Sequence, residues 1–243
     1  MGITQRRERE RQEMKELILD AAIRLFSEES YEATTMRRIA ERIEYTPGTI
    51  YGYFKDKSEI LFELHTRGFD RLIEYQRKAI EGLIDPDDKI EALGRAYVRF
   101  GLEHSALYDL MFVDRNTGRS ILEAEAWDPG LCAYGILRDV MVDFIGKHHL
   151  DLDPDVASFT CWSLVHGMVS LQIRNRCVMI PSEHLTQVTE LSHRFFVLML
   201  RGEAHRALAF KPVDEEDTRP KKVQKASPAE AKPRRRTHPD ALG

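Results

Sequence analysis

Apolar residues recur at helical spacing near the start of the chain, between positions 13 and 27. They fall three and four residues apart, which places them on one face of a helix and predicts an amphipathic helix. Residues 1–13 before it carry dense charge of both signs, as expected of a solvated extension of that helix. The positions of the stripe are Leu17, Ile18, Ala21, Ala22, Leu25 and Phe26.

A second pattern, at residues 34–61, predicts two short helices joined by a tight turn. Thr35 is a candidate N-cap, and Ile39 and Ile43 lie four apart on the helix that follows it. The pair Thr46-Pro47 begins the next helix, because Thr caps well and proline fits the first helical position, where its missing N–H has no partner.

The second short helix carries its own core positions, Ile50 and Phe54, four residues apart. Asp56 and Glu59 then resemble a capping box and predict a third helix. Two short helices joined in this way form a helix-turn-helix, whose second helix lies in the major groove of DNA.

These residues also resemble a family signature. The run Thr35-x-x-x-Ile39-Ala40, followed by Gly48-Thr49-x-Tyr51-x-Tyr53-Phe54-x-x-Lys57-x-x-Ile60-Leu61, is similar to that of the tetracycline-repressor (TetR/AcrR) regulators. The recognition-helix geometry predicts base contacts by Thr46, Pro47, Gly48 and Tyr51. The resemblance adds Arg37 as a base reader and Thr35, Thr49, Tyr53 and Lys57 as phosphate contacts. Packing alone is the alternative role for Tyr51 and Tyr53.

The turn between the two helices departs from the family pattern. Glycine is usual there because it adopts positive φ at little cost, whereas this chain has Glu44. We expect a strained or altered turn at this position.

Later apolar stripes predict helices throughout the rest of the chain, so we predict an all-α fold. Residues 1–60 would form a three-helix DNA-binding domain and residues 61–210 a helical ligand-binding and dimerisation domain. The predicted helices span 59–82, 88–113, 131–149, 155–176 and 184–201, with loop chemistry and a helical turn or two between 114 and 130.

The tail at residues 211–243 holds five of the chain's ten prolines and almost no large apolar residue. We expect it to be disordered, because it cannot bury enough surface to offset the entropy of ordering. Its basic stretch at 219–236 is either a solvated tail or a weak, salt-sensitive contact with DNA.

Composition adds little support for DNA binding, since the net charge is −4 and the first 82 residues are nearly neutral. Basic surface must therefore come from placement, for example by an N-terminal arm that reaches phosphates. We expect no membrane helix, no signal segment and a cytoplasmic protein. The three cysteines are small buried hydrophobes in this interpretation, with a thiol sensor as the alternative.

Enzyme signatures are missing, so we predict no catalytic site, no metal and no cofactor. His104 and His166 lie on apolar stripes, where a core or pocket histidine is favoured over a metal ligand. We expect a small apolar ligand to bind among the helices of residues 88–176. The predicted lining is Tyr97, Phe100, His104, Tyr108, Phe112, Tyr134, Phe144, Trp162 and His166.

The run Trp162-x-x-x-His166-Gly167 resembles the TetR C-terminal subclass named for Trp, His and Gly. That resemblance implies pairing of the last two helices with those of a second subunit as a four-helix interface. The interface residues would be Ser163, Gly167, Ser170, Leu191, Phe195 and Leu198.

We therefore expect a homodimeric transcriptional regulator, a repressor that a small ligand releases from a near-palindromic DNA operator. The alternative is an all-α small-molecule carrier or enzyme in which the helix-turn-helix is only scaffold.

Overall fold

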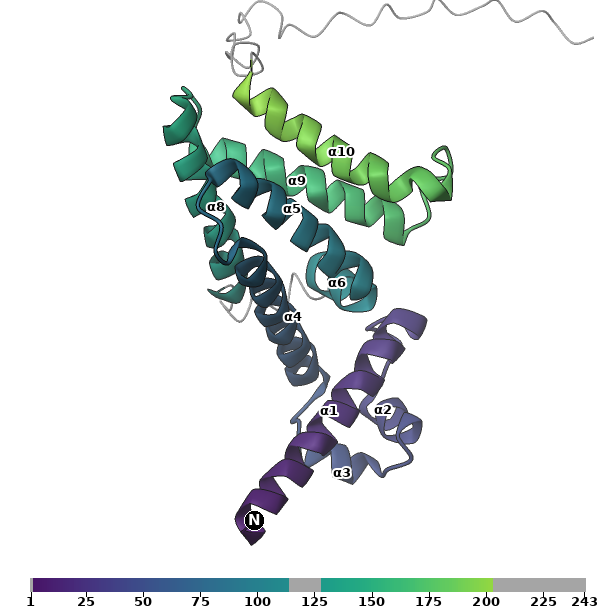
Figure 1. Cartoon of the computed structure of the whole chain (residues 1–243). Coiled ribbons are helices and arrows are strands. Elements are labelled where there is room, and N and C mark those ends of the chain that lie inside the picture. Colours follow the sequence, from purple (N-terminus) through teal and green to yellow (C-terminus); the bar gives the residue numbers. More distant parts are fainter. Residues whose placement is uncertain (1, 114–127, 203–243) are drawn as a thin grey trace, which may run out of the picture. The chain divides into compact units, whose positions relative to one another are not determined.

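The computed structural model describes residues 2–113 and 128–202, and every regular element in these ranges is a helix (Figure 1). The predicted all-α fold class is confirmed. The expectations for residues 114–127 and for the tail lie outside the described residues. The helices are α1 (Ile3–Glu29), α2 (Met36–Arg42), α3 (Pro47–Tyr51), α4 (Lys57–Ile80), α5 (Pro86–Glu103), α6 (Ser105–Phe112), α8 (Asp128–His148), α9 (Pro154–Ile173) and α10 (Ser182–Arg201).

The first three helices and the start of α4 share one core, which we call the head core. Leu17 lies at the edge of the α1 stripe and is exposed, so its predicted burial is wrong; Leu19 is buried instead. The buried members of the head core are Ile18, Leu19, Ala21, Ala22, Leu25, Met36, Ile39, Ala40, Ile50, Phe54, Ile60, Leu61, Leu64 and Leu110.

Helix α4 runs out of the head and packs against α5, α6 and α8 (Figure 1). Its first turns bury Ile60 and Leu64 in the head core, and its later turns bury Phe69 and Leu72 in a second cluster. One continuous helix therefore contributes to two cores.

The single helix predicted at 88–113 is wrong, because the chain breaks it into α5 and α6. His104 has φ −125° and ψ 45°, which is outside the helical region. Because the chain changes direction here, α6 contributes side chains to two clusters. Tyr108 packs in the second cluster, whereas Leu110 packs in the head core.

Helix α9 is long and apolar enough to cross a membrane by length and composition alone. A helix buried in a bundle passes the same test. Here the positions Ala157, Cys161, Val165 and Val169, each four apart, form a buried face, and α9 packs against α5, α8 and α10.

A charge cluster joins the ends of three helices around Asp87 at the start of α5. Its carboxylate lies 2.6 Å from Lys147 Nζ and 2.8 Å from His148 Nε2, both at the end of α8. The Arg201 guanidinium, at the end of α10, is 3.2 Å away. These partners hold the pKa of Asp87 at about 2 even though burial opposes ionisation.

Candidate DNA-binding surface and ligand pocket

The two short helices of the head are begun by side-chain caps at the predicted residues. Thr35 Oγ1 accepts a hydrogen bond from the Arg38 amide at 3.2 Å, and Thr46 Oγ1 accepts one from the Thr49 amide at 3.3 Å. Pro47 occupies the first turn of α3. Local sequence therefore determines where both helices start.

Helix α4 begins with a variant of the predicted capping box. Asp56 Oδ1 accepts from the Glu59 amide at 2.9 Å, as expected. The Glu59 carboxylate reaches the amide of Lys55 at 2.5 Å, one residue before the position that a capping box uses.

The turn between α2 and α3 has the unusual backbone expected of it. Glu44 has φ 60°, in the left-handed region that an L-residue enters at a cost of roughly 1–2 kcal/mol. Its amide donates to the Glu41 carbonyl at 3.2 Å, and the Tyr45 amide donates to the Ala40 carbonyl at 2.9 Å. The turn type that glycine would supply is thus kept with a glutamate in place.

Helix α3 turns Ile50 into the head core and leaves the predicted base-contact positions at the surface. Tyr51 is 56% exposed, and Thr46, Pro47 and Gly48 are also exposed. The Thr46 and Thr49 hydroxyls lie 3.1 Å apart and can exchange a hydrogen bond. The exposed face therefore offers hydroxyl and phenol groups together with the N-terminal end of a short helix.

Tyr53 is half-buried beside the head core, with the Arg11 guanidinium 5.3 Å from its ring centre. This arrangement gives Tyr53 a packing role as well as a position near the surface. It also brings the N-terminal segment of α1 against the end of the recognition region.

Two of the three arginines of α2 form ion pairs with α1, and the third faces solvent. Arg38 pairs with Glu29 at 2.5 Å and Arg42 with Glu28 at 2.6 Å, and both acids lie on α1. Among the described residues Arg37 pairs with Glu41 of its own helix alone, at 2.8 Å, and its side chain is 80% exposed. Of these three, Arg37 is the one positioned to leave its partner for an external anion or base.

Lys57 occupies a different environment from the one that the resemblance implies. Its Nζ donates to the carbonyl oxygens of Tyr31 at 2.5 Å and Thr34 at 2.8 Å, and it lies 4.1 Å from the centre of the Tyr31 ring. Burial lowers the pKa of this ammonium. The geometry argues against a phosphate contact by Lys57, because the loop between α1 and α2 already takes its N–H groups.

An aromatic cavity of about 360 Å³ lies among α4, α5, α6, α8 and α9, and we call it the aromatic pocket. Five of the nine predicted pocket residues line it: Tyr97, Phe112, Tyr134, Trp162 and His166. The other lining residues are Phe69, Leu72, Gln76, Leu93, Gly94, Met111, Gly130, Leu131, Ala133, Leu137, Cys161 and Val165.

Four predicted pocket residues lie elsewhere. Phe100 is fully buried and packs edge-on against Tyr75, and His104 lies beside the same tyrosine. Phe144 is buried in a different hydrophobic cluster, where its ring packs against His148. Tyr108 does not line the cavity but holds the side chain of His166, which does.

Some of the lining residues that the prediction missed do follow a pattern in the sequence. Phe69 and Leu72 lie on the apolar stripe of α4 that leads out of the head core. Gln76 lies on the same face, and its Nε2 donates to the Ala133 carbonyl at 3.2 Å. A polar residue in an apolar stripe could have indicated that α4 borders a cavity.

Hydrogen bonds among side chains organise one wall of the aromatic pocket. Trp162 Nε1 donates to Tyr97 Oη at 3.1 Å. The hydroxyls of Tyr108 and Tyr97 lie 2.6 Å and 3.3 Å from His166 Nδ1. Burial raises the pKa of Tyr97 to about 12 and lowers that of His166, so both groups are neutral near pH 7.

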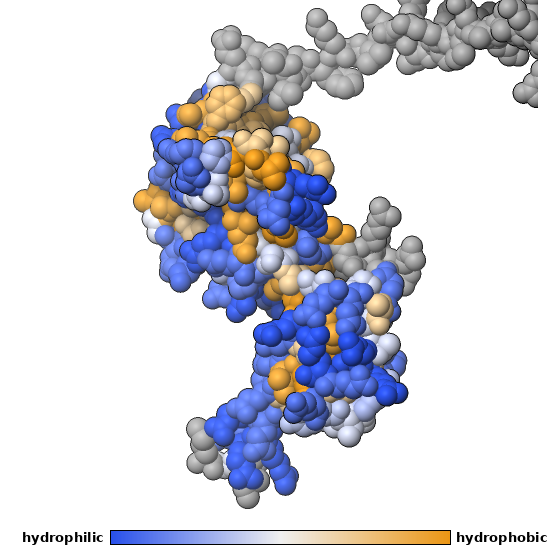
Figure 2. All heavy atoms as spheres, turned by 90° about the vertical axis from the view of Figure 1, so that its right-hand side faces the viewer, coloured by the Kyte–Doolittle hydropathy of each residue, from blue (hydrophilic) through white to orange (hydrophobic). Residues whose placement is uncertain are grey.

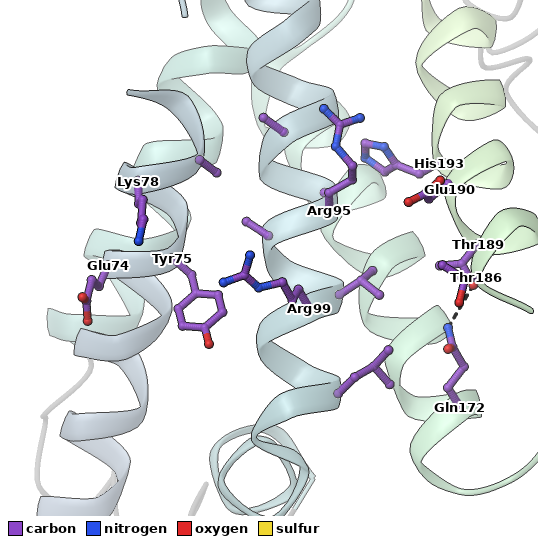
Figure 3. A pocket seen from close by; sticks show the side chains of 16 residues that line it. Glu74, Tyr75, Lys78, Arg95, Arg99, Gln172, Thr186, Thr189, Glu190 and His193 are labelled. Carbon is purple, nitrogen blue, oxygen red and sulfur yellow. Dashed lines mark hydrogen bonds between the residues drawn. The ribbon is translucent and has the colours of Figure 1, made fainter. Parts of the chain in front are cut away.

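A larger cleft of about 850 Å³ lies between α4, α5 and α10, with a different chemical character. Figure 3 shows Arg95 and Arg99 extending into it from α5. Each is paired along its own helix, Arg95 with Glu91 at 3.3 Å and Arg99 with Glu103 at 3.2 Å. The cleft thus differs from the aromatic pocket in that charged side chains of α4, α5 and α10 border it.

The predicted dimer residues of α9 and α10 lie on surfaces that no part of the described chain covers completely. Phe195 is 63% exposed, and Leu191 and Leu198 are also exposed. A Cβ added at Gly167 would meet no atom within 4 Å. Apolar side chains gather over the C-terminal helices in Figure 2, whereas the head is mostly hydrophilic on that face.

Neighbouring apolar side chains extend this surface, which we call the α9–α10 face. Val156, Phe159 and Leu171 are exposed on α9, and Val188 and Met199 on α10. Ser163 is exposed and Ser170 half-buried. An apolar surface of this extent on two adjacent helices is typical of an interaction site.

The described residues contain no group of three or more His, Cys, Asp or Glu side chains placed to hold a metal ion. Cys161 is buried in the wall of the aromatic pocket, and burial raises its thiol pKa to about 12. Cys132 is exposed and Cys177 partly exposed, so the expectation that all three cysteines are buried is wrong.

Two family models match the chain. One, described as "Bacterial regulatory proteins, tetR family", matches residues 18–64, and the other, "Tetracyclin repressor-like, C-terminal domain", matches residues 90–194. Neither description names the Trp-His-Gly subclass, so that part of the resemblance is not confirmed.

Curated relatives include the HTH-type transcriptional regulator HbdR of Aromatoleum sp. (strain CIB), 37% identical over 79 residues, 32% of this chain and 34% of that protein. The HTH-type transcriptional repressor KstR of Rhodococcus jostii (strain RHA1) is 42% identical over 60 residues, 25% of this chain and 28% of that protein. The matched segments thus span about a third of the relatives' length.

Solved structures share the fold over most of both chains. The fatty acid degradation regulator FadR of Bacillus halodurans aligns with TM-score 0.63 and 19% identity, covering 75% of this chain and 94% of that one. FadR of Bacillus subtilis, solved in complex with stearoyl-CoA, aligns with TM-score 0.61 and 19% identity, covering 76% and 97%. Together, the helix-turn-helix head, the aromatic pocket and the two matching models show that the chain belongs to the tetR family of bacterial regulatory proteins.

Proposed function

We propose that this protein is a homodimeric, DNA-binding transcriptional repressor that leaves its operator when a small ligand enters the aromatic pocket. Residues 1–60 form its DNA-binding domain, residues 61–210 its ligand-binding and dimerisation domain, and residues 211–243 a tail. Since its target is bacterial DNA, the protein works in the cytoplasm.

One observation carries the proposal: two helices take part in both the head core and the wall of the aromatic pocket. On α4, Leu64 belongs to the head core and Phe69 lines the pocket. On α6, Leu110 belongs to the head core, whereas Met111 and Phe112 line the pocket. A ligand that displaces the pocket wall therefore acts on side chains adjacent to those that hold the head.

Helices α4 and α6 pack closely where they cross. A Cβ added at Gly68 of α4 would collide with the Met111 side chain of α6. Close-packed cores transmit displacement because they have few voids to absorb it. Movement of α6 toward or away from the pocket therefore moves α4, whose first turns belong to the head core.

Dimerisation follows from the α9–α10 face and from the size of α3. A short recognition helix contacts few base pairs, so selective binding uses two heads held about one helical turn apart, ~34–36 Å. Pairing of α9 and α10 with a second copy would bury the exposed apolar side chains and fix that spacing. A ligand-induced change of the spacing would lower operator affinity.

Selection of bound DNA from a random pool by the full chain tests this proposal. We expect enrichment of two inverted half-sites whose centres lie one turn apart, and gel shifts at physiological salt that single half-sites do not give. A pool that stays random after repeated rounds would contradict the DNA-binding role.

A further inference from the structure

The wall of the aromatic pocket contains a histidine whose two nitrogens have different surroundings. His166 Nδ1 is approached by two hydroxyls, from Tyr108 at 2.6 Å and from Tyr97 at 3.3 Å. For Nε2 the described residues provide no hydrogen-bond partner, and the side chain lines the cavity. The two nitrogens therefore differ in the hydrogen-bond partners available to them.

The hydrogen bonds around Nδ1 bear on which nitrogen carries the proton, because the two tautomers reverse the roles of donor and acceptor at Nδ1. An indole N–H can only donate, so the Tyr97 oxygen accepts from Trp162 and its own proton is free to point toward Nδ1. The shorter Tyr108 bond, at 2.6 Å, has the length of a strong hydrogen bond from a hydroxyl. Tyr108 Oη can also donate to the carbonyl oxygen of His166, 3.3 Å away. When Tyr108 donates to Nδ1, the shorter of its two contacts, the neutral imidazole carries its proton on Nε2.

The rest of the lining excludes a charged ligand. Among the described residues, the lining contains no lysine, arginine, aspartate or glutamate. A carboxylate or phosphate buried there would lose its hydration without gaining a counter-charge, which is costly. The paired arginines in Figure 3, Arg95 and Arg99, border the larger cleft and not the aromatic pocket.

We propose that the effector is an uncharged, largely apolar molecule with a carbonyl oxygen, and that the Nε2–H of His166 donates the hydrogen bond that binds this oxygen. Tyr108 acts as a positioning residue, since its hydroxyl holds the histidine in the donating tautomer. The inference rests on the proposed function, because it assigns the chemistry of the same cavity.

Three probes of similar shape test the ligand class: butylbenzene, 4-phenyl-2-butanone and 3-phenylpropanoate. The chain has two tryptophans, so Trp127→Phe leaves Trp162 in the pocket wall as the only indole emitter. In this background we expect Trp162 fluorescence to titrate with the ketone and the hydrocarbon. The carboxylate should bind at least about tenfold more weakly than the ketone at pH 7.5, and equal or tighter binding would overturn the uncharged class.

Substitution of His166 isolates the hydrogen bond. With His166→Phe, the ratio of ketone to hydrocarbon affinity should fall about tenfold, because the donor is lost while an apolar ring remains. His104→Phe is the matched control, since His104 does not line the pocket, and it should leave the ratio unchanged. A ratio that His166→Phe does not change would overturn the assignment of the donor.

Nitrogen NMR of the unliganded chain examines the tautomer directly. We expect the His166 resonances of an unprotonated Nδ1 and a protonated Nε2, and a loss of this pattern in Tyr108→Phe. A protonated Nδ1 in the wild type would contradict the inference. If none of the three probes changes Trp162 fluorescence, both the ligand class and the use of the aromatic pocket fail, whereas the DNA-binding role is decided separately by gel shift.

Discussion

The head and the C-terminal helices bury their apolar residues in different ways. In the head, short helices begin at caps such as Thr35 and Thr46 and close over one core, and the exposed face of α3 is polar. The C-terminal helices enclose an aromatic cavity and leave Phe195 and its neighbours exposed. The head core closes within one chain, whereas the C-terminal helices leave a cavity and an exposed apolar face.

This difference separates two kinds of stability. Changes on the α9–α10 face should affect association and leave the fold of each chain intact. Changes to the hydrogen bonds of Lys57 in the head, or to the ion pairs of Asp87 at the helix ends, should lower the free energy of unfolding. The predictions below use this contrast.

The largest effect should come from Gly167→Leu. A Cβ at position 167 meets no atom of its own chain within 4 Å, so we expect each chain to fold. Across a symmetric interface the substitution occurs twice and should force the helices apart. We expect a folded monomer in sedimentation experiments and a loss of about 10²–10⁴-fold in affinity for a selected two-half-site DNA, because two linked heads bind cooperatively.

Gly146→Leu provides a matched control on α8. A Cβ added at Gly146 also meets no atom within 4 Å, but the residue lies outside the α9–α10 face. This variant should remain a dimer with normal DNA affinity. If Gly167→Leu behaves like Gly146→Leu, the dimer interface lies elsewhere.

Within the head, Lys57→Ala should lower the free energy of unfolding by about 1.5–3 kcal/mol, the range for hydrogen bonds to a charged group. The substitution leaves the carbonyls of Tyr31 and Thr34 without their donor. Urea unfolding measures the loss. The salt dependence of DNA binding supplies the discriminating result: an unchanged slope supports the structural tie, and a slope reduced by about one unit indicates a phosphate contact instead.

At the C-terminal helix ends, Asp87→Asn should cost about 1–3 kcal/mol at pH 7, because Lys147 and Arg201 lose their shared carboxylate. The folded pKa of about 2 is below the unfolded value of about 3.9, so the ionised group stabilises the fold above pH ~4. That contribution is lost as the pH falls toward 2. The difference between wild type and variant should therefore shrink across this window in acid unfolding, and a constant difference would contradict the assignment.

The same contrast explains how much of the structure could be predicted from the sequence. The caps at Thr35, Thr46 and Asp56 depend on residues two or three positions away, so spacing alone located them. The aromatic pocket depends on five helices meeting, and no local pattern distinguishes Phe112, which lines it, from Phe100, which does not. The break at His104 was missed because no proline marks it, and the nearby glycine, Gly101, lies inside α5.

Glu44 departs from the local rules that locate the helices of the head, as does Ser30 at the end of α1, where φ is 79°. The φ of 60° at Glu44 places a glutamate where glycine is the least strained residue. The strain at Glu44 is small compared with the interactions of Lys57 and Asp87, because the turn still forms its backbone hydrogen bonds. A substitution here should therefore give the smallest effect of the series.

Glu44→Gly should raise the free energy of unfolding by about 0.5–1 kcal/mol. Relief of the left-handed strain, roughly 1–2 kcal/mol, is partly offset by the greater backbone entropy of glycine in the unfolded chain, about 0.5–1 kcal/mol. Glu44→Ala removes the carboxylate but keeps the strain, so it separates the backbone effect from charge. Urea unfolding of both variants measures the difference. If alanine stabilises the head as much as glycine does, the carboxylate and not the backbone is the source of the cost.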